Sequence, residues 1–166
     1  MRKINIIYAG GMKEKYYKEA AGEYIKRLGG EFKIENTEIK EVPVPEKAGI
    51  GEIGFCLKKE GEKILEKAGA HSANSHSSFK IALCPEGKKL SSEDFSALLY
   101  GEKAVNAQSV SFFIGSSHGL SDEVKKSADF ILSFSDMTFP HSLIRVMLME
   151  QIYRAYAIET GRKYHK

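Results

Sequence analysis

Short apolar segments alternate with segments of helical spacing along most of this chain, and this alternation constrains its fold more than any other feature. Helices are expected at residues 13–28, 53–68, 91–101, 121 onward and 140–160. Strands are expected at residues 3–9, 32–42, 79–84, 110–114 and 130–134. Such alternation favours an α/β fold, a mainly parallel sheet with helices on both faces. The 166 residues suit one domain, residues 1–166.

The chemistry of such a fold is expected in the loops that follow the strands, because ligands of open parallel sheets bind beyond the carboxyl ends of the strands. The loops after residues 79–84, 110–114 and 130–134 are therefore the first places to examine. Gly10-Gly11 lacks the third glycine of a dinucleotide-binding fingerprint, and the sequence contains no P-loop. Nucleotide binding of either kind is poorly supported.

Composition narrows the class of protein further. Lys and Arg number 25 against 22 Asp and Glu, and the small excess lies in residues 141–166, so a histone-like polyanion binder is excluded. Two cysteines, Cys56 and Cys84, are too few for a disulfide framework and lack metal-ligand spacing, and His71 and His76 lie in a polar segment. Without a secretory or membrane-spanning segment, we expect a cytoplasmic protein with no membrane partner and no metal.

Residues 115–119, Gly-Ser-Ser-His-Gly, match the G-x-S-x-G pattern of a nucleophile elbow between a strand and a helix. A serine hydrolase would use Ser117 with an acid and a histidine further along the chain, drawn from Asp129, Asp136, His141 and His165. The alternative is a glycine-rich turn that brings backbone N–H groups close to a ligand. We favour the turn, because five-residue patterns recur by chance and the chain is short for a hydrolase.

The C-terminal helix carries apolar residues on every face, which indicates burial on all sides. Either a second subunit covers it or it is a central helix of one subunit. His141, Arg145, Leu148 and Ile152 follow one stripe, whereas Glu150 and Arg154 form an i,i+4 pair on the opposite side.

The basic tail after this helix ends in Tyr164, His165 and Lys166. A paired, fixed Arg154 beside these residues suits phosphate contacts and base stacking. A solvated basic end is the plainer interpretation. A non-catalytic RNA- or ribosome-binding module would use the same residues.

Several motifs carry a resemblance to a known family across essentially the whole chain. They are Ser-Phe-Ser-Asp-Met-Thr-Phe-Pro-His at 133–141, Phe-Ile-Gly at 113–115, Gly119-Leu120 and the terminal Tyr-His-Lys. The chain resembles the bacterial 23S rRNA pseudouridine N3-methyltransferases of the SPOUT superfamily. That resemblance implies a C-terminal trefoil knot, S-adenosylmethionine as methyl donor, a homodimer, and 23S rRNA in the assembled 70S ribosome as substrate.

The resemblance also implies roles for individual residues, including Ser116, which stands where the family commonly has a second glycine. Positions of RNA binding or catalysis map to Glu150, Arg154, Tyr164 and His165. The cofactor pocket maps to Leu83, Cys84, Gly115, Ser116, Ser135, Asp136, Met137, Thr138, Phe139 and Pro140.

Methyl transfer from a sulfonium needs alignment and removal of the N3 proton, but no metal. His165 is a candidate base, because imidazole titrates near neutral pH. Arg154 could stabilise the imide anion or hold a phosphate, and Tyr164 could stack on the base. The sequence leaves open which group takes the proton.

Overall fold

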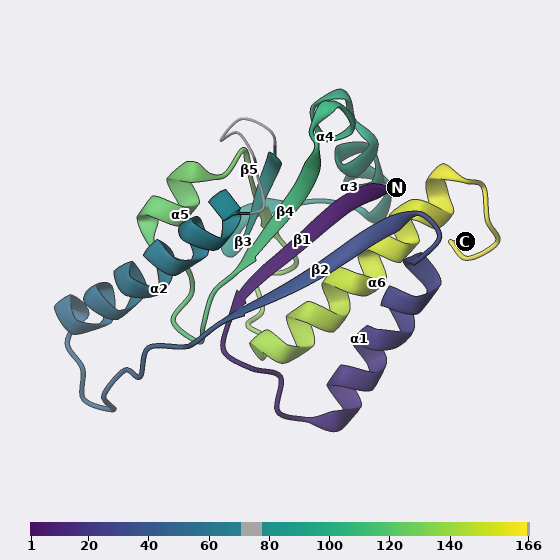
Figure 1. Ribbon diagram of the computed structural model, residues 1–166. Coiled ribbons are helices and arrows are strands. Elements are labelled where there is room, and N and C mark those ends of the chain that lie inside the picture. Colours follow the sequence, from purple (N-terminus) through teal and green to yellow (C-terminus); the bar gives the residue numbers. More distant parts are fainter. Residues whose placement is uncertain (71–77, 166) are drawn as a thin grey trace.

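The computed structural model describes residues 1–70 and 78–165 (Figure 1). His71, His76 and Lys166, named above, lie outside the described residues. The helices are α1 (Lys15–Leu28), α2 (Ile50–Ala70), α3 (Ser92–Tyr100), α4 (Glu102–Asn106), α5 (Asp122–Ser127) and α6 (His141–Glu159). The strands are β1 (Arg2–Ala9), β2 (Phe32–Ile39), β3 (Ser78–Lys89), β4 (Ser109–Ile114) and β5 (Phe130–Ser133).

These five strands form one sheet in the order β2-β1-β4-β3-β5, and every neighbouring pair is parallel. The central strand β4 is buried along its whole length, which explains its unbroken apolar character. The predicted parallel α/β sheet is confirmed. All strand carboxyl ends therefore meet at one edge.

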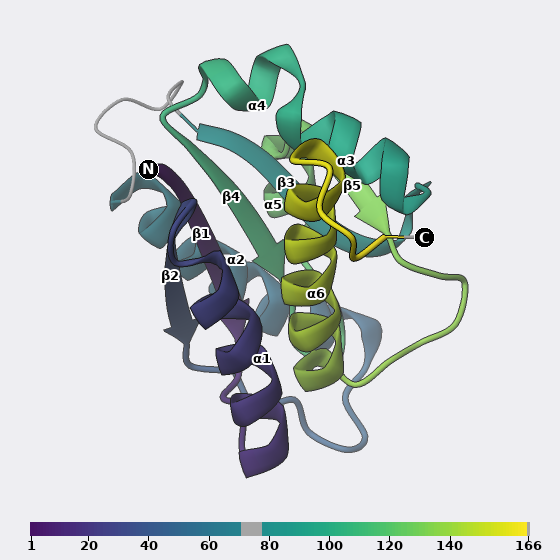
Figure 2. The ribbon, with the colours of Figure 1, turned by 90° about the vertical axis from the view of Figure 1, so that its right-hand side faces the viewer.

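Helices cover both faces of the sheet, as predicted (Figures 1 and 2). On one face, α1, α3 and α6 pack over a core that includes Ile6, Phe112 and Ile152. On the other face, α2 and α5 cover a second core around Ile64 and Phe113. Alternate residues of β1 and β4 point to opposite faces, so each strand contributes to both cores.

Two of these helices begin at serine N-caps, at the positions where the sequence predicts helix starts. The Asp94 backbone N–H donates to Ser91 Oγ at 3.0 Å at the start of α3, and Val124 N–H donates to Ser121 Oγ at 3.4 Å at the start of α5. Serine oxygens thus satisfy backbone donors that the first helical turn leaves free. At the end of α6, Gly161 adopts φ +66°, the left-handed conformation that stops a helix.

The structure departs from the predicted elements at four places, the first of which is the strand expected at residues 32–42, which ends at Ile39. The strand expected to end at residue 84 continues to Lys89, with a register shift between Leu83 and Lys88. The helix expected from residue 53 begins at Ile50, inside the predicted loop, and α4 was not predicted as a separate helix. The extra strand length comes from pairing with β5. This contact is non-local, so the apolar periodicity of the local sequence does not predict it.

Helix α6 lies between α1 and α3 against the sheet (Figure 2). The predicted stripe is buried at Arg145, Leu148 and Ile152. Its outer face, with Leu143, Val146 and Met147, is only half-buried. One subunit therefore covers part of this helix and leaves an apolar strip partly exposed.

Candidate functional site

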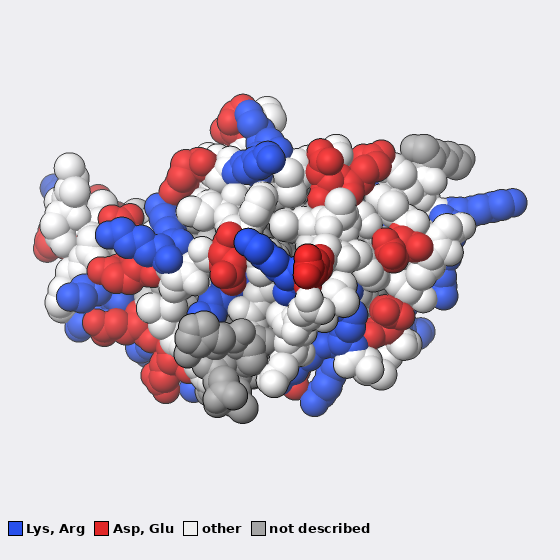
Figure 3. Space-filling model, turned by 90° about the horizontal axis from the view of Figure 1, so that it is seen from above, with Lys and Arg blue, Asp and Glu red and all other residues white. Residues whose placement is uncertain are grey.

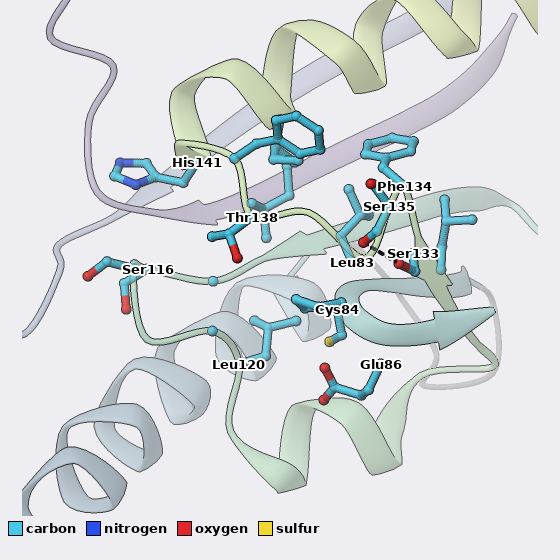
Figure 4. Close-up of a pocket in the computed structure, with 18 of the residues that line it drawn as sticks. Leu83, Cys84, Glu86, Ser116, Leu120, Ser133, Phe134, Ser135, Thr138 and His141 are labelled. Atoms are coloured by element: carbon cyan, nitrogen blue, oxygen red, sulfur yellow. Dashed lines mark hydrogen bonds between the residues drawn. The ribbon is translucent and has the colours of Figure 1, made fainter. Parts of the chain in front are cut away.

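A cavity of about 370 Å³ opens at the carboxyl ends of β4 and β5, beside the register shift in β3, and we call it the strand-end cavity (Figure 4). It is lined by residues 83–86, the turn 114–120, residues 132–135 and 137–139, and the first turn of α6. Three consecutive strands thus converge on one hollow, as the sheet topology requires. Of the residues expected to bind a cofactor, those that line it are Leu83, Cys84, Gly115, Ser116, Ser135, Met137, Thr138 and Phe139.

Asp136 and Pro140 do not line the cavity, although they belong to the same loop. The Asp136 carboxylate pairs with Lys89 Nζ, and its side chain is 79% exposed. Pro140 is exposed and immediately precedes α6. Both side chains point away from the cavity while their neighbours line it, so a contiguous motif supplies only part of a lining.

The turn after β4 is held in a tight conformation by its two glycines. Gly119 N–H donates to Ser116 O at 2.9 Å, and Gly119 adopts φ +90°. A Cβ on Gly115 would lie 2.0 Å from Gly119 O, so only glycine fits at that position.

The Ser116 hydroxyl is engaged in a hydrogen bond with α2, because Ser116 Oγ donates to Glu60 Oε2 at 2.8 Å. Glu60 belongs to α2 and is 3% exposed, and its other oxygen accepts from Val42 N–H at 2.7 Å. Ser116 therefore ties this turn to α2. Sequence reasoning missed Glu60, because no local pattern links residues that lie 56 positions apart.

The loop that follows β5 is ordered by its own serines. Ser133 Oγ donates to Ser135 O at 3.1 Å, and Met137 N–H donates to Ser135 Oγ at 3.0 Å. Met137 is 71% exposed at the mouth of the cavity. The backbone of this loop is thereby held beside the hollow.

The cavity wall carries an uncharged cysteine and an ion pair. Burial raises the pKa of Cys84 to about 11, so the thiol stays protonated at neutral pH and is a poor nucleophile. Glu86 and Lys125 also line the cavity and pair at 2.5 Å. The hydrogen bond from Lys125 lowers the pKa of Glu86, and the same contact raises the pKa of Lys125.

The four residues expected to act on RNA come together at the outer face of α6. Arg154 Nε donates to Glu150 Oε1 at 2.9 Å, and Tyr164 Oη donates to the same oxygen at 3.2 Å. Arg154 Nη1 donates to His165 Nδ1 at 3.3 Å, and its guanidinium lies 4.8 Å from the Tyr164 ring centre. We call Glu150, Arg154, Tyr164 and His165 the tail cluster.

Glu93, which the sequence did not single out, completes the tail cluster from α3. Its Oε1 lies 2.7 Å from His165 Nε2, so both ring nitrogens of His165 have partners. Burial raises the pKa of Tyr164 to about 12, which keeps the phenol neutral.

A second hollow of about 390 Å³ lies between the first cavity and the tail cluster. Leu132, Ser133 and Phe134 line both hollows, and Glu150 lines the second. A single wall therefore separates the strand-end cavity from the side where the tail cluster lies.

Comparison with known proteins establishes the family. A family model described as "Predicted SPOUT methyltransferase" matches residues 2–165. The chain belongs to this family. As a SPOUT methyltransferase, it catalyses methyl transfer. The strand-end cavity is lined by residues of the motifs at 113–120 and 133–141 that resemble this family.

Curated relatives agree over the full length of this SPOUT methyltransferase. "Ribosomal RNA large subunit methyltransferase H" of Streptococcus agalactiae serotype III (strain NEM316) is 45% identical over 164 residues, 99% of each chain. The protein of the same name from Clostridium acetobutylicum (strain ATCC 824) is 44% identical and covers 98% of this chain and 99% of its own.

Two solved structures share the fold. A probable methyltransferase from Bordetella pertussis Tohama I has a TM-score of 0.54 at 13% identity, over 93% of this chain and 94% of its own. The SpoU methyltransferase AviRb from Streptomyces viridochromogenes has a TM-score of 0.52 at 11% identity. This chain, over 96% of its length, spans 61% of AviRb.

The serine hydrolase alternative is wrong for this SPOUT methyltransferase. Ser117 Oγ lies 3.3 Å from Nδ1 of its neighbour His118, and both side chains are exposed. His165 is engaged with Glu93 and Arg154 instead. The G-x-S-x-G pattern is the tight turn that the glycines require.

Within residues 1–70 and 78–165, no group of three or more His, Cys, Asp and Glu side chains could hold a metal ion. No helix in the same ranges has the length and apolar character to cross a membrane.

Proposed function

We propose that this chain methylates N3 of a pseudouridine in 23S rRNA, with S-adenosylmethionine as methyl donor and the assembled 70S ribosome as substrate. The name of the full-length relatives supports rRNA of the large subunit, and the family resemblance supports the base and the donor. The observation that carries the proposal is the wall at 132–134, shared by the strand-end cavity and the hollow beside Glu150.

The strand-end cavity fits the donor in size and in chemistry. Small-molecule sites commonly measure about 300–1,000 Å³ and combine apolar walls with a few placed polar groups. Here Leu83, Leu120 and Ile144 supply apolar surface, and the loop after β5 supplies backbone groups. The protonated Cys84 thiol would not compete for the methyl group. When bound, S-adenosylmethionine supplies an already activated methyl group.

The tail cluster fits the side that receives the nucleobase. Arg154 is fixed by two hydrogen bonds to Glu150 and stacks on Tyr164, so it can hold a phosphate or an imide anion without reordering. His165 must leave Glu93 before Nε2 can take a proton. We propose that substrate binding at the tail displaces His165 from Glu93.

We also propose that the enzyme is a homodimer in which the outer face of α6 meets a second copy. Leu143, Val146 and Met147 on this face are only half-buried in one subunit, and the tail cluster lies on the same face. The tail of one subunit could then act at the pocket of the other. A trefoil knot of the C-terminal segments and a single domain over residues 1–166 belong to the same proposal.

Recognition by shape rather than by bulk charge accords with the surface. In Figure 3, basic and acidic side chains are interspersed over the face seen from above. The net charge of +3 offers few phosphate contacts, so isolated rRNA should be a poor substrate compared with 70S particles. Cytoplasmic localisation follows from that substrate.

Calorimetry with S-adenosylmethionine tests the cofactor site directly. Binding heat is expected from the full chain and from a chain that lacks Tyr164–Lys166, whereas only the full chain should methylate 70S ribosomes. Absence of heat would favour a non-catalytic ribosome-binding module. Retained methylation after the deletion would contradict the role of the tail, and equal methylation of naked rRNA would contradict the 70S substrate.

A further inference from the structure

A third cavity, of about 540 Å³, lies between α1 and α6, apart from the two hollows described above. We call it the α1–α6 cavity. Its lining includes Tyr8, Lys13, Lys18, Glu38 and Arg145. None of these residues belongs to the strand-end cavity or to the tail cluster.

Arg145 is the unusual member of this lining. It is 4% exposed, and its Nε and Nη1 N–H groups are buried without an acceptor in residues 1–70 and 78–165. Its guanidinium carbon lies 4.2 Å from the ring centre of Tyr8, and Nη2 donates to Ser142 Oγ at 3.3 Å. Burial lowers the pKa of Arg145, partly offset by Tyr8, Glu38 and Glu14. A buried guanidinium with two idle donors is costly unless an anion satisfies it.

The charge around Arg145 favours an anion. Lys13 and Lys18 are exposed at the cavity, and neither forms an ion pair with another described residue. Glu38 is the acidic side chain of the lining, and the charge of Glu14 also reaches Arg145. Three cations thus outweigh two carboxylates.

The surroundings favour RNA over a free ion. Tyr16 and Tyr17, between the two lysines in sequence, have ring centres 4.4 Å apart, and Tyr16 is 62% exposed. Exposed aromatic rings beside lysines are typical of single-stranded RNA contacts.

The α1–α6 cavity also lies next to the strand-end cavity. His141 and Ile144 line the latter, whereas Arg145 and Met149 line the former from the same helix. A Cβ on Gly10 would lie 3.6 Å from His141 Nε2, so the connection from β1 to α1 borders both.

We propose that the α1–α6 cavity binds a phosphate group of the RNA strand that carries the methylated nucleotide, through Arg145, Lys13 and Lys18. This inference rests on the RNA substrate of the proposed function. The cavity would contact the RNA backbone on the side of α6 opposite to the tail cluster. Because the Arg145 donors are covered in the free protein, the guanidinium should shift when the phosphate enters.

The first test follows the Nε–Hε signal of Arg145 by NMR in the full chain, identified by its loss in Arg145→Lys. A short single-stranded RNA should shift this signal without any methyl donor present. If only inorganic phosphate shifts it, the cavity is a simple ion site and the assignment to RNA is wrong. If neither does, the proposal is overturned. A cofactor that failed to bind would contradict the proposed function but leave this readout unaffected.

The second test uses surface variants that do not endanger folding. Lys13→Gln with Lys18→Gln should weaken RNA binding and reduce the slope of log affinity against log salt by about 0.7, the contribution of one single-strand phosphate contact. The matched control, Lys63→Gln with Lys126→Gln, removes the same charge from α2 and α5 on the other face of the sheet. Equal slopes in both double variants would refute the phosphate contact.

Discussion

Glu150→Gln tests whether the tail cluster is a structural ion pair or part of the catalytic apparatus. Glu150 Oε1 accepts from Arg154 Nε at 2.9 Å and from Arg154 Nη2 at 2.5 Å. The two side chains are only 19% and 26% exposed. Glutamine keeps an acceptor at this position but removes the negative charge, so the ion pair becomes hydrogen bonds from a cation to a neutral amide.

The cost of this substitution follows from the hydrogen bonds that it weakens. Replacing the carboxylate with a neutral acceptor weakens each bond from Arg154 by about 1 kcal/mol in a mostly buried setting, so two bonds lose about 2 kcal/mol. For a chain of this size, that loss lowers Tm by about 4–8 °C. The loosened Arg154 and Tyr164 would present the base poorly, and the methylation rate on 70S ribosomes should fall by about tenfold or more.

Glu23→Gln is the matched control for burial. Glu23 and Arg27 form the same i,i+4 pair on α1 with a 3.0 Å contact, but their side chains are 53% and 44% exposed. Solvent screens such a pair, so we expect no measurable change in Tm or in methylation. Calorimetry should show unchanged cofactor affinity for both variants. Equal Tm losses would refute the burial argument, and full activity of Glu150→Gln would refute the catalytic placement of the tail cluster.

Three further predictions concern the strand-end cavity and α2. Gly115→Ala should abolish cofactor binding by calorimetry, because its Cβ would lie 2.0 Å from Gly119 O; normal affinity would show that the turn can relax. Gly54→Ala, in α2 with open space around it, should instead stabilise the protein by about 0.5–1 kcal/mol in urea unfolding, and a loss would contradict this. Burial raises the pKa of Cys84 from 9.0 to about 11, so the unfolded thiol ionises first and stability should fall as pH rises between these values. Cys84→Ser should lack that component of the decline, and an identical pH profile would contradict the shift.

Local periodicity was sufficient for several features of the site. The i,i+4 spacing of Glu150 and Arg154 predicts their contact, because one helical turn brings such residues together. The buried stripe through Arg145, Leu148 and Ile152 follows from the same geometry. The alternation of strands and helices predicts the parallel sheet and hence the edge at which the cavity opens.

Family resemblance supplied expectations that periodicity could not, namely that the loop after β5 and the pair Tyr164-His165 are functional elements. Even so, a motif read as a string does not say which way each side chain points. Asp136 belongs to the motif but pairs with Lys89 at the surface, while its neighbours line the cavity.

Only the tertiary structure brought together residues far apart in the chain. It placed Glu60 against Ser116 and Glu93 against His165, and it brought the unpaired donors of Arg145 into the same cavity as Lys13 and Lys18. These contacts depend on how crossover connections order the strands and stack helices on the two faces of the sheet. Sequence patterns reflect neighbours within a turn or a pleat, whereas such long-range packing is decided by the whole fold.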